Sequence, residues 1–329
     1  MIKIDLITGY LGAGKTTFIR EYARYLMDQG EKICIIENDY GAVNVDMVLL
    51  QDLLGENCNL EMIVGGDGKE AHRRRYKTKL ISMGMQGFDR VIIEPSGIYD
   101  VDEFFDVLYD EPLDRWYEVG NVISLVDSGA VFDLSGIERY IFMSEIAQAG
   151  KLVFTKVTDP ASIPAITDAV NRIMEEYKAA PFDPKRDIMI GASAQPFEKG
   201  APEQPITGLS EADFASLKTC GYRHASYAKL PVGEKQFTPL FYFDAQMPES
   251  VLLELVQKMF ESRDAGHVIR IKGIVQTGED SRISINATEK QITLEPAAGS
   301  RNILILIGEG LDKSYFNELL KDYCSVVSL

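Results

Sequence analysis

The sequence contains no long apolar run, and none of its apolar segments approaches the roughly 20 residues that a membrane-spanning helix requires. Basic residues are also scarce, because 34 Lys and Arg residues stand against 50 Asp and Glu residues, a formal net charge of −16. Non-specific binding to nucleic acid or to anionic membranes needs a basic surface, so this balance argues against both kinds of partner. An anionic small molecule can still bind in a local basic pocket.

Cysteine and histidine are few, with four and three residues respectively in a chain of 329. The cysteines form no Cys-x-x-Cys pair and are scattered at Cys34, Cys58, Cys220 and Cys324. Such spacing predicts free thiols in a reducing compartment rather than a disulfide framework. The first apolar segment begins at Ile2, which leaves no room for a signal peptide, so we expect a cytoplasmic protein.

The first part of the chain alternates apolar runs with helical patterns, which is typical of an α/β domain with a mainly parallel sheet flanked by helices. The clearest helix spans Ala161–Lys178, with apolar residues at helical spacing on one face. The predicted strands are Ile2–Ile7, Lys32–Glu37, Arg90–Glu94, Asn121–Val126, Lys151–Thr155 and Asp187–Gly191.

The pattern changes after residues 198–209, where Gly and Pro residues interrupt a stretch with little apolar content. We therefore predict a first domain at 1–205, a linker at 206–221 and a smaller α+β domain with an antiparallel sheet at 222–329. The predicted elements of the second domain are strands Gln236–Phe243, Val268–Val275, Ser281–Asn286, Gln291–Glu295 and Asn302–Ile307 and helices Glu249–Ser262 and Asp312–Tyr323.

The most informative motif lies between the first predicted strand and a helical pattern that starts at Phe18. It fits Gly-x-x-x-x-Gly-Lys-[Ser/Thr], the phosphate-binding P-loop, with the residues Gly9, Gly12, Ala13, Gly14, Lys15, Thr16 and Thr17. The glycines let backbone N–H groups curl around phosphates, and the helix N-terminus attracts anions. We expect Lys15 to contact the β- and γ-phosphates and the Thr16 hydroxyl to ligate Mg²⁺.

A nucleotide hydrolase also needs an acidic residue near Mg²⁺ and a group that senses the γ-phosphate. The strand end Glu94-Pro95-Ser96-Gly97 offers candidates for both roles. Glu94 is the candidate acid, acting on Mg²⁺ through water or on the attacking water, and the Gly97 N–H is the candidate γ-phosphate contact. An ordinary turn at the end of a buried strand is the alternative interpretation.

Guanine specificity usually depends on Asn/Thr-Lys-x-Asp at a strand end, where the carboxylate accepts hydrogen bonds from N1 and N2 of the base. The corresponding segment here is Thr155-Lys156-Val157-Thr158-Asp159, so Asp159 comes one residue late, although the Lys156 stem can still stack on the base. Ser193 and Ala194, after the next predicted strand, are weaker candidates for a backbone contact to guanine O6. These residues favour guanine over adenine and leave adenine open.

Together these motifs resemble the CobW group of P-loop GTPases, relatives of HypB and UreG that serve metal and cobalamin metabolism. The matching residues are Thr8–Thr17, Glu37–Gly41, Glu94–Gly97, Val126-Asp127, Arg270–Ile274 and Ile307–Leu311. The resemblance covers nearly the whole chain and implies a GTPase domain followed by a smaller CobW-C-like domain. It also implies a switch loop at residues 37–46, with Glu37 and Asp39 near Mg²⁺ and the γ-phosphate.

The chain departs from this family where a Cys-x-Cys-Cys motif would bind a transition metal, because residues 63–69 contain no cysteine. Cys58, Asp67 and His72 are the nearest candidate ligands. A small buried residue for Cys58 and a helix-surface residue for His72 are the simpler interpretations. The sequence leaves open whether a transition metal binds and which one.

One basic cluster follows this segment, at residues 72–79, and includes Arg73, Arg74 and Arg75. It is either a solvated helix face or a surface that binds an anion or a partner, for example by supplying an arginine to a neighbour's nucleotide.

The resemblance implies a protein that binds GTP and Mg²⁺ and hydrolyses GTP slowly until a partner completes the site, with catalysis carried by Lys15, Glu94, Asp39 and Glu37. It further implies coupling of the nucleotide state to a client enzyme that depends on a metal or a corrinoid, and it allows a nucleotide-dependent homodimer. Two alternatives stay open. One is a P-loop ATPase or kinase, favoured by the displaced Asp159, and the other is a nucleotide-dependent binding module with negligible hydrolysis.

Overall fold

The computed structural model of the chain describes residues 1–39, 50–64, 69–96, 101–134, 136–191, 208–228, 240–279, 281–289, 291–297 and 302–326. These residues divide into two compact units, the first reaching residue 228 and the second beginning at residue 240. Among the helices of the described ranges, none is long and apolar enough to cross a membrane.

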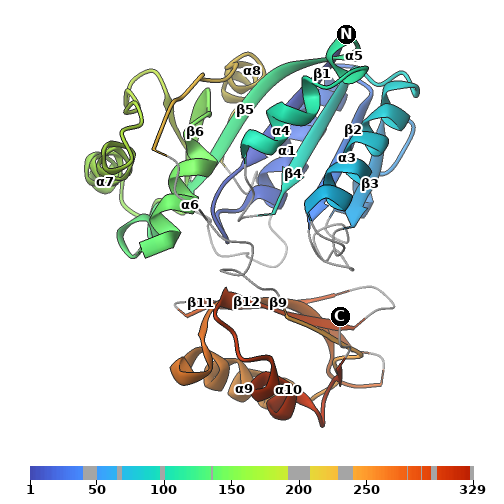
Figure 1. Ribbon diagram of the computed structural model, residues 1–329, viewed down its shortest axis with the longest axis vertical. Helices are drawn as coiled ribbons and strands as arrows, with labels where there is room; N and C mark the ends of the chain where they lie inside the picture. Colours follow the sequence, from blue (N-terminus) through green and yellow to red (C-terminus); the bar gives the residue numbers. More distant parts are fainter. Residues whose placement is uncertain are drawn as a thin grey trace. The chain divides into compact units, whose positions relative to one another are not determined.

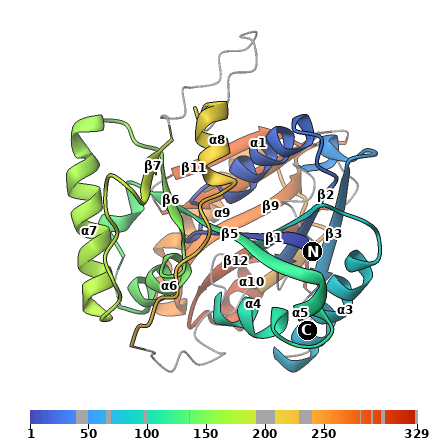
Figure 2. The same ribbon diagram turned by 90° about the horizontal axis from the view of Figure 1, so that it is seen from above.

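A seven-stranded parallel sheet forms the centre of the first unit, in the order β3-β2-β4-β1-β5-β6-β7. Helices α1 and α8 cover one face, and α3, α4, α5 and α6 cover the other (Figure 1 and Figure 2). This arrangement confirms the predicted α/β architecture. The strands are β1 (Ile2–Thr8), β2 (Ile33–Asp39), β3 (Cys58–Val64), β4 (Arg90–Pro95), β5 (Tyr117–Asp127), β6 (Lys151–Thr155) and β7 (Ile188–Ile190). The helices are α1 (Lys15–Asp28), α3 (Lys69–Gly84), α4 (Val101–Leu108), α5 (Leu113–Trp116), α6 (Gly136–Ile146), α7 (Ile163–Glu176) and α8 (Glu211–Leu217).

The periodicity of the sequence explains these elements. Every residue of β4 is buried, as expected of a parallel strand covered on both faces. In α1, the apolar residues that recur at helical spacing are the buried ones, and they form one face of the helix. Gly30, with φ +82°, follows directly after the helix in the left-handed conformation that commonly ends helices.

The edge strand β3 was not predicted. It pairs only with β2, and its partly exposed residues Asn59 and Glu61 alternate with buried ones, so it lacks the continuous apolar run that marks the central strands. The predicted helix at 161–178 is α7, and a short 3-10 turn, η3 (Pro160–Ser162), precedes it.

The described residues 208–228 belong to the first unit, although the sequence placed a linker at 206–221 and the start of the second domain at 222. Residues 211–217 form α8, whose N-terminus carries a capping box between Ser210 and Asp213. After α8, the Gly221 carbonyl accepts a hydrogen bond from the Val122 N–H at 3.0 Å. This bond attaches the segment after α8 to β5. Residues 208–228 are held in place by contacts with distant strands. Their local sequence carries no sign of these contacts, and it therefore resembles a linker.

A six-stranded antiparallel sheet with α9 and α10 on one face forms the second unit (Figure 1), as predicted for an α+β domain. The sheet order is β11-β10-β9-β12-β8-β13. Buried residues of the sheet and the two helices make one apolar core, which includes Ile271, Leu304, Val256 and Phe316. The elements are β8 (Leu240–Phe243), α9 (Glu249–Glu261), β9 (His267–Gln276), β10 (Arg282–Thr288), β11 (Gln291–Pro296), β12 (Ile303–Glu309), α10 (Lys313–Leu320) and β13 (Ser325–Val326).

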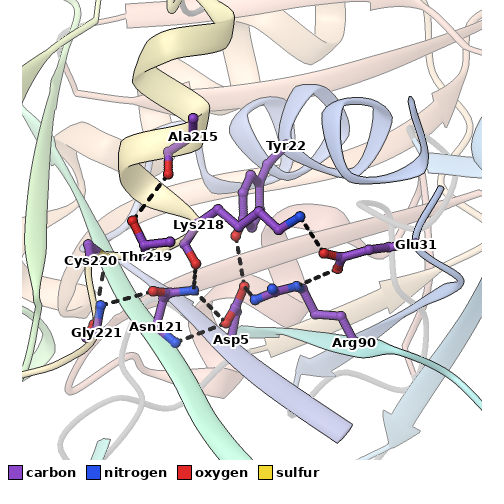
Figure 3. Close-up of polar contacts among 10 residues, drawn as sticks. All are labelled: Asp5, Tyr22, Glu31, Arg90, Asn121, Ala215, Lys218, Thr219, Cys220 and Gly221. Carbon is purple, nitrogen blue, oxygen red and sulfur yellow. Dashed lines mark hydrogen bonds and ion pairs between the residues drawn. The ribbon is translucent and has the colours of Figure 1, made fainter. Parts of the chain in front are cut away.

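A buried polar cluster in the first unit surrounds Asp5 in the middle of β1 (Figure 3). The Asp5 Oδ2 accepts hydrogen bonds from Arg90 Nη1 at 2.7 Å and from the Tyr22 hydroxyl at 2.8 Å. Its Oδ1 accepts two bonds at 2.9 Å, from the backbone N–H and the side-chain amide of Asn121. Burial raises the pKa of the Asp5 carboxyl, and the Arg90 charge opposes this shift. The cluster therefore joins β1 to β4, β5 and α1.

The same cluster reaches the segment after α8 (Figure 3). Arg90 Nε donates to Glu31 at 2.8 Å, and Glu31 also pairs with Lys218. The Asn121 amide donates to the Lys218 carbonyl at 3.0 Å and accepts from the Gly221 N–H at 2.9 Å. These bonds fasten residues 218–221 to the base of the sheet.

Replacing Arg90 by Met should destabilise the first unit, because Asp5 then stays buried without its cation. Breaking a buried ion pair by removing one partner costs about 3–5 kcal/mol. Urea unfolding followed by circular dichroism measures this change. Arg115→Met is the control, since Arg115 pairs with Glu111 on the exposed surface and should change the midpoint little. Equal midpoints for the two variants would contradict a supporting role for the Asp5 cluster.

Candidate functional site

The loop between β1 and α1 has the backbone geometry that phosphate binding requires. Gly9, Gly12 and Gly14 have φ of +143°, +83° and +92°, conformations that residues with a side chain rarely adopt. A Cβ on Gly9 would also lie 2.5 Å from the Leu125 oxygen, so only glycine fits between the loop and β5. The loop ends at the N-terminus of α1, where unpaired backbone N–H groups attract anions.

Lys15, the first residue of α1, turns back over this loop. Its Nζ donates to the Gly9 carbonyl at 2.7 Å, and only 7% of the residue is exposed. Within the loop, the Ala13 N–H donates to the Tyr10 carbonyl at 3.0 Å. The structure thus holds the ammonium group above the glycines, where a phosphate chain in the loop would lie. Thr17 follows in the first turn of α1 and is partly exposed.

Thr16 and Glu94 lie together although 78 positions separate them in the chain. The Thr16 hydroxyl donates to Glu94 Oε1 at 2.9 Å. Glu37 is at the same register on the neighbouring strand β2, and both carboxylates are nearly fully buried. Buried carboxylate and hydroxyl oxygens at the end of a parallel sheet are the donors that Mg²⁺ prefers, so these residues fit that ion.

Several candidate residues cannot be placed. Gly97, Ser193, Ala194 and Asp67 lie outside the described residues, as does most of the expected switch loop at 37–46. Asp39 is the last residue of β2, and the structure describes its backbone and not its side chain.

A buried carboxylate under the loop was not predicted from the sequence. Glu145 in α6 is fully buried, and its Oε2 accepts the Gly9 N–H at 2.8 Å. Its carbonyl accepts the Thr8 hydroxyl at 2.7 Å and the Ser124 hydroxyl at 3.1 Å. A charged residue within the apolar run 140–149 was the available signal, because a buried charge needs specific polar partners.

The segment after β6 is tied to the phosphate loop. The Thr155 hydroxyl donates to the Ala13 carbonyl at 2.9 Å. Lys156 has φ +56°, and its Nζ pairs with Asp127 Oδ2 at 2.7 Å. Asp159 is the N-cap of η3, and its Oδ1 accepts the Ala161 N–H at 2.9 Å. The structure therefore brings Thr155 and Lys156 beside the P-loop. Asp159 instead caps the 3-10 turn η3.

The candidate transition-metal ligands do not form a site among the described residues, which contain no group of three or more His, Cys, Asp or Glu side chains suited to a metal ion. Cys58 is buried, and burial raises the pKa of its thiol to about 11, so it stays protonated at neutral pH. The prediction of a helix-surface position for His72 was wrong, because only 1% of the residue is exposed.

The basic cluster at 72–79 has carboxylate partners in its own chain. Arg73 Nη2 and Lys77 Nζ approach Asp110 Oδ2 at 3.2 and 3.4 Å, and Lys79 Nζ lies 2.7 Å from Glu61. Arg74 is exposed on α3. Arg73, Lys77 and Lys79 thus have ion-pair partners within the first unit, as the residues of a solvated helix face commonly do.

Comparison with known proteins gives two family matches. The nucleotide-binding domain of CobW/HypB/UreG matches residues 3–181, and the C-terminal domain of the cobalamin synthesis protein CobW matches residues 239–324. The zinc chaperone YjiA of Escherichia coli is 31% identical over 168 residues, 49% of this chain and 50% of the relative. The zinc chaperone YeiR of the same organism is 29% identical over 157 residues, 47% of each chain. The chain thus spans about half the length of the curated relatives it matches.

Among solved structures, Zn(II)-bound YjiA GTPase from E. coli is similar over 98% of both chains, with 19% identity and a TM-score of 0.34.

Replacing Glu145 by Ala should weaken nucleotide binding, because the Gly9 N–H would lose its acceptor and the loop its fixed position. Leaving a buried donor unpaired costs enough to predict about tenfold weaker binding of a fluorescent GTP analogue. Glu145→Gln keeps an acceptor oxygen and should restore most of the affinity. Glu138→Ala, which removes a partner of the Tyr10 hydroxyl, is the matched control. Equal losses in the Ala and Gln variants would exclude this positioning role.

Proposed function

Because the chain belongs to the CobW/HypB/UreG family of nucleotide-binding proteins, we propose that it binds GTP with Mg²⁺ and hydrolyses it slowly. The observation that carries the proposal is the set formed by the glycine loop, Lys15 and the Thr16–Glu94 pair at one end of the parallel sheet. These groups have the chemistry to hold a triphosphate and its metal ion.

The P-loop residues bind the triphosphate in this proposal. The backbone N–H groups of residues 12–16 face the phosphates, and Lys15 exchanges its bond to the Gly9 carbonyl for the β- and γ-phosphate oxygens. Glu145 accepts the Gly9 N–H and holds the loop in position during this exchange. Gly97, outside the described residues, is the proposed γ-phosphate contact.

Thr16 would hold Mg²⁺ directly, and Glu94 would hold it through water. Bound Mg²⁺ supplies positive charge that stabilises the oxygens of the transferring phosphoryl group. Glu94 and Glu37, with Asp39, then orient the attacking water. Because this chemistry depends mostly on positioning and charge, turnover should stay slow until a partner completes the site.

Two variants separate binding from hydrolysis. Lys15→Ala should abolish GTP binding, whereas Glu94→Gln should bind GTP within a few-fold of wild type and hydrolyse it at least about tenfold more slowly. Calorimetry measures the affinity and phosphate release measures turnover, each with GTP and ATP. Arg115→Met serves as a surface control. Faster turnover of ATP than of GTP would replace this proposal with the ATPase or kinase alternative, and binding without turnover would favour the binding module.

We also propose that the nucleotide state is coupled to the delivery of a metal to a client enzyme or to the activation of that client. The zinc-chaperone names of two relatives support this step. A corrinoid-dependent client and a nucleotide-dependent homodimer are finer versions of the same proposal. Among the described residues, no group of three or more His, Cys, Asp or Glu side chains could hold a metal ion, and Cys58 is buried.

Measurement of zinc binding tests the proposal that the protein handles a metal. Cys58→Ser should leave the zinc affinity unchanged within about twofold, because Cys58 is buried and belongs to no group of metal-ligating side chains among the described residues. Competition with a chromogenic zinc chelator measures the affinity, and GTP turnover is followed with and without zinc. A loss of zinc binding in Cys58→Ser would show that the ligands have been relocated to this residue.

A further inference from the structure

The start of the segment Thr155–Asp159 is hydrogen-bonded to the P-loop and to the residue after β5. Besides the Thr155 bond to Ala13, the Ser128 N–H donates to the Thr155 carbonyl at 3.1 Å. The Ser128 hydroxyl donates to the Lys156 carbonyl at 2.9 Å. Hydrogen bonds to Ala13 in the P-loop and to Ser128 after β5 therefore hold the start of this segment beside the P-loop.

The backbone conformation and the ion pair of Lys156 both restrict its side chain. Its backbone adopts the left-handed conformation, which is uncommon for a residue with a side chain and concentrates at functional sites. The ion pair with Asp127 holds the extended aliphatic stem in one direction, and Asp127 is itself fixed by the Gly129 and Ala130 N–H groups at 2.9 and 3.2 Å. The Lys156 side chain is thus directed toward Asp127 at the end of β5, and it remains partly exposed.

Asp159 has a different role from the usual aspartate. Pro160 follows it and restricts it to extended backbone, observed at φ −133° and ψ 115°. In that conformation its carboxylate caps η3 through Ala161, and its carbonyl accepts the Ser162 N–H at 3.0 Å. One oxygen of the carboxylate thereby helps to start the turn that leads into α7.

Thr158 occupies the position two residues after the lysine, where the guanine-reading carboxylate usually stands. It is exposed, while Val157 before it is buried. A threonine hydroxyl is neutral, whereas a carboxylate accepts charge-assisted bonds from both N1–H and N2–H of guanine.

We propose that this site holds the face of the base and does not read its N1 and N2 edge, so that GTP, ITP and XTP bind alike. The proposal rests on the proposed function, since it concerns the base of the same nucleotide. Inosine lacks the 2-amino group and xanthine replaces it with an oxygen. Without a base-reading carboxylate, the 2-amino group of guanine adds no affinity. The oxygen at the same position of xanthine meets no negative charge and lowers the affinity little. Discrimination against adenine then depends on groups near O6.

The test measures the affinities of GTP, ITP, XTP and ATP by competition with a fluorescent GDP analogue, with Mg²⁺ present. Wild type should bind GTP, ITP and XTP within about threefold of one another, because no bond to a charged acceptor distinguishes them. Thr158→Asp restores the usual spacing and should bind GTP at least about tenfold more tightly than ITP or XTP, the effect of hydrogen bonds to a charged acceptor.

Asp159→Asn is the matched variant, because asparagine keeps the helix cap and removes the charge. The ratio of its affinities for GTP and ITP should stay near that of wild type. A wild-type preference for GTP of tenfold or more that Asp159→Asn abolishes would overturn the inference and leave the GTPase proposal intact. If the Thr158→Asp variant keeps the wild-type ratios of affinity among GTP, ITP and XTP, the inference is also overturned. Failure to bind any of the four nucleotides would overturn the proposed function itself.

Discussion

A buried carboxylate in the middle of β1 is the constraint on which the first unit depends. Asp5 is fully buried, and its four hydrogen bonds come from β4, β5 and α1. Each of these partners would be costly to remove, because an uncompensated buried charge is strongly unfavourable. The cluster therefore fixes β1 against both neighbours and α1 against β1. Since the P-loop joins β1 to α1, its position follows from this arrangement.

The buried acidic residues of the first unit take different roles. Asp5 and Glu145 are structural acids, since one ties the strands together and the other holds the Gly9 N–H. Glu94 and Glu37 are also buried, but they stand in register at the carboxyl ends of their strands, and Glu94 contacts the Thr16 hydroxyl. The hydrogen-bond partners therefore separate the acids that support the fold, which accept from backbone N–H groups, Arg90 and Tyr22, from Glu94, which meets the Thr16 hydroxyl.

The sequence predicted those features that depend on local pattern. The strands with continuous apolar runs, helix α1 and the glycine loop all follow from residues close together in the chain. The edge strand β3 and the attachment of residues 208–228 to the first unit were missed, because both depend on pairing with distant strands. Glu145 was missed for the same reason, since 136 positions separate it from Gly9.

The sequence by itself determined the fold class, the family resemblance and the phosphate loop, because strand and helix periods and the glycine spacing are local properties of the chain. The tertiary structure decided which polar residues serve the fold and which face the site. Glu145 is one example, since its contact with the Gly9 N–H joins residues 136 positions apart, and no residue near it in the sequence indicates that contact. Burial and hydrogen-bond partners assign these roles, and both arise only when distant segments pack together.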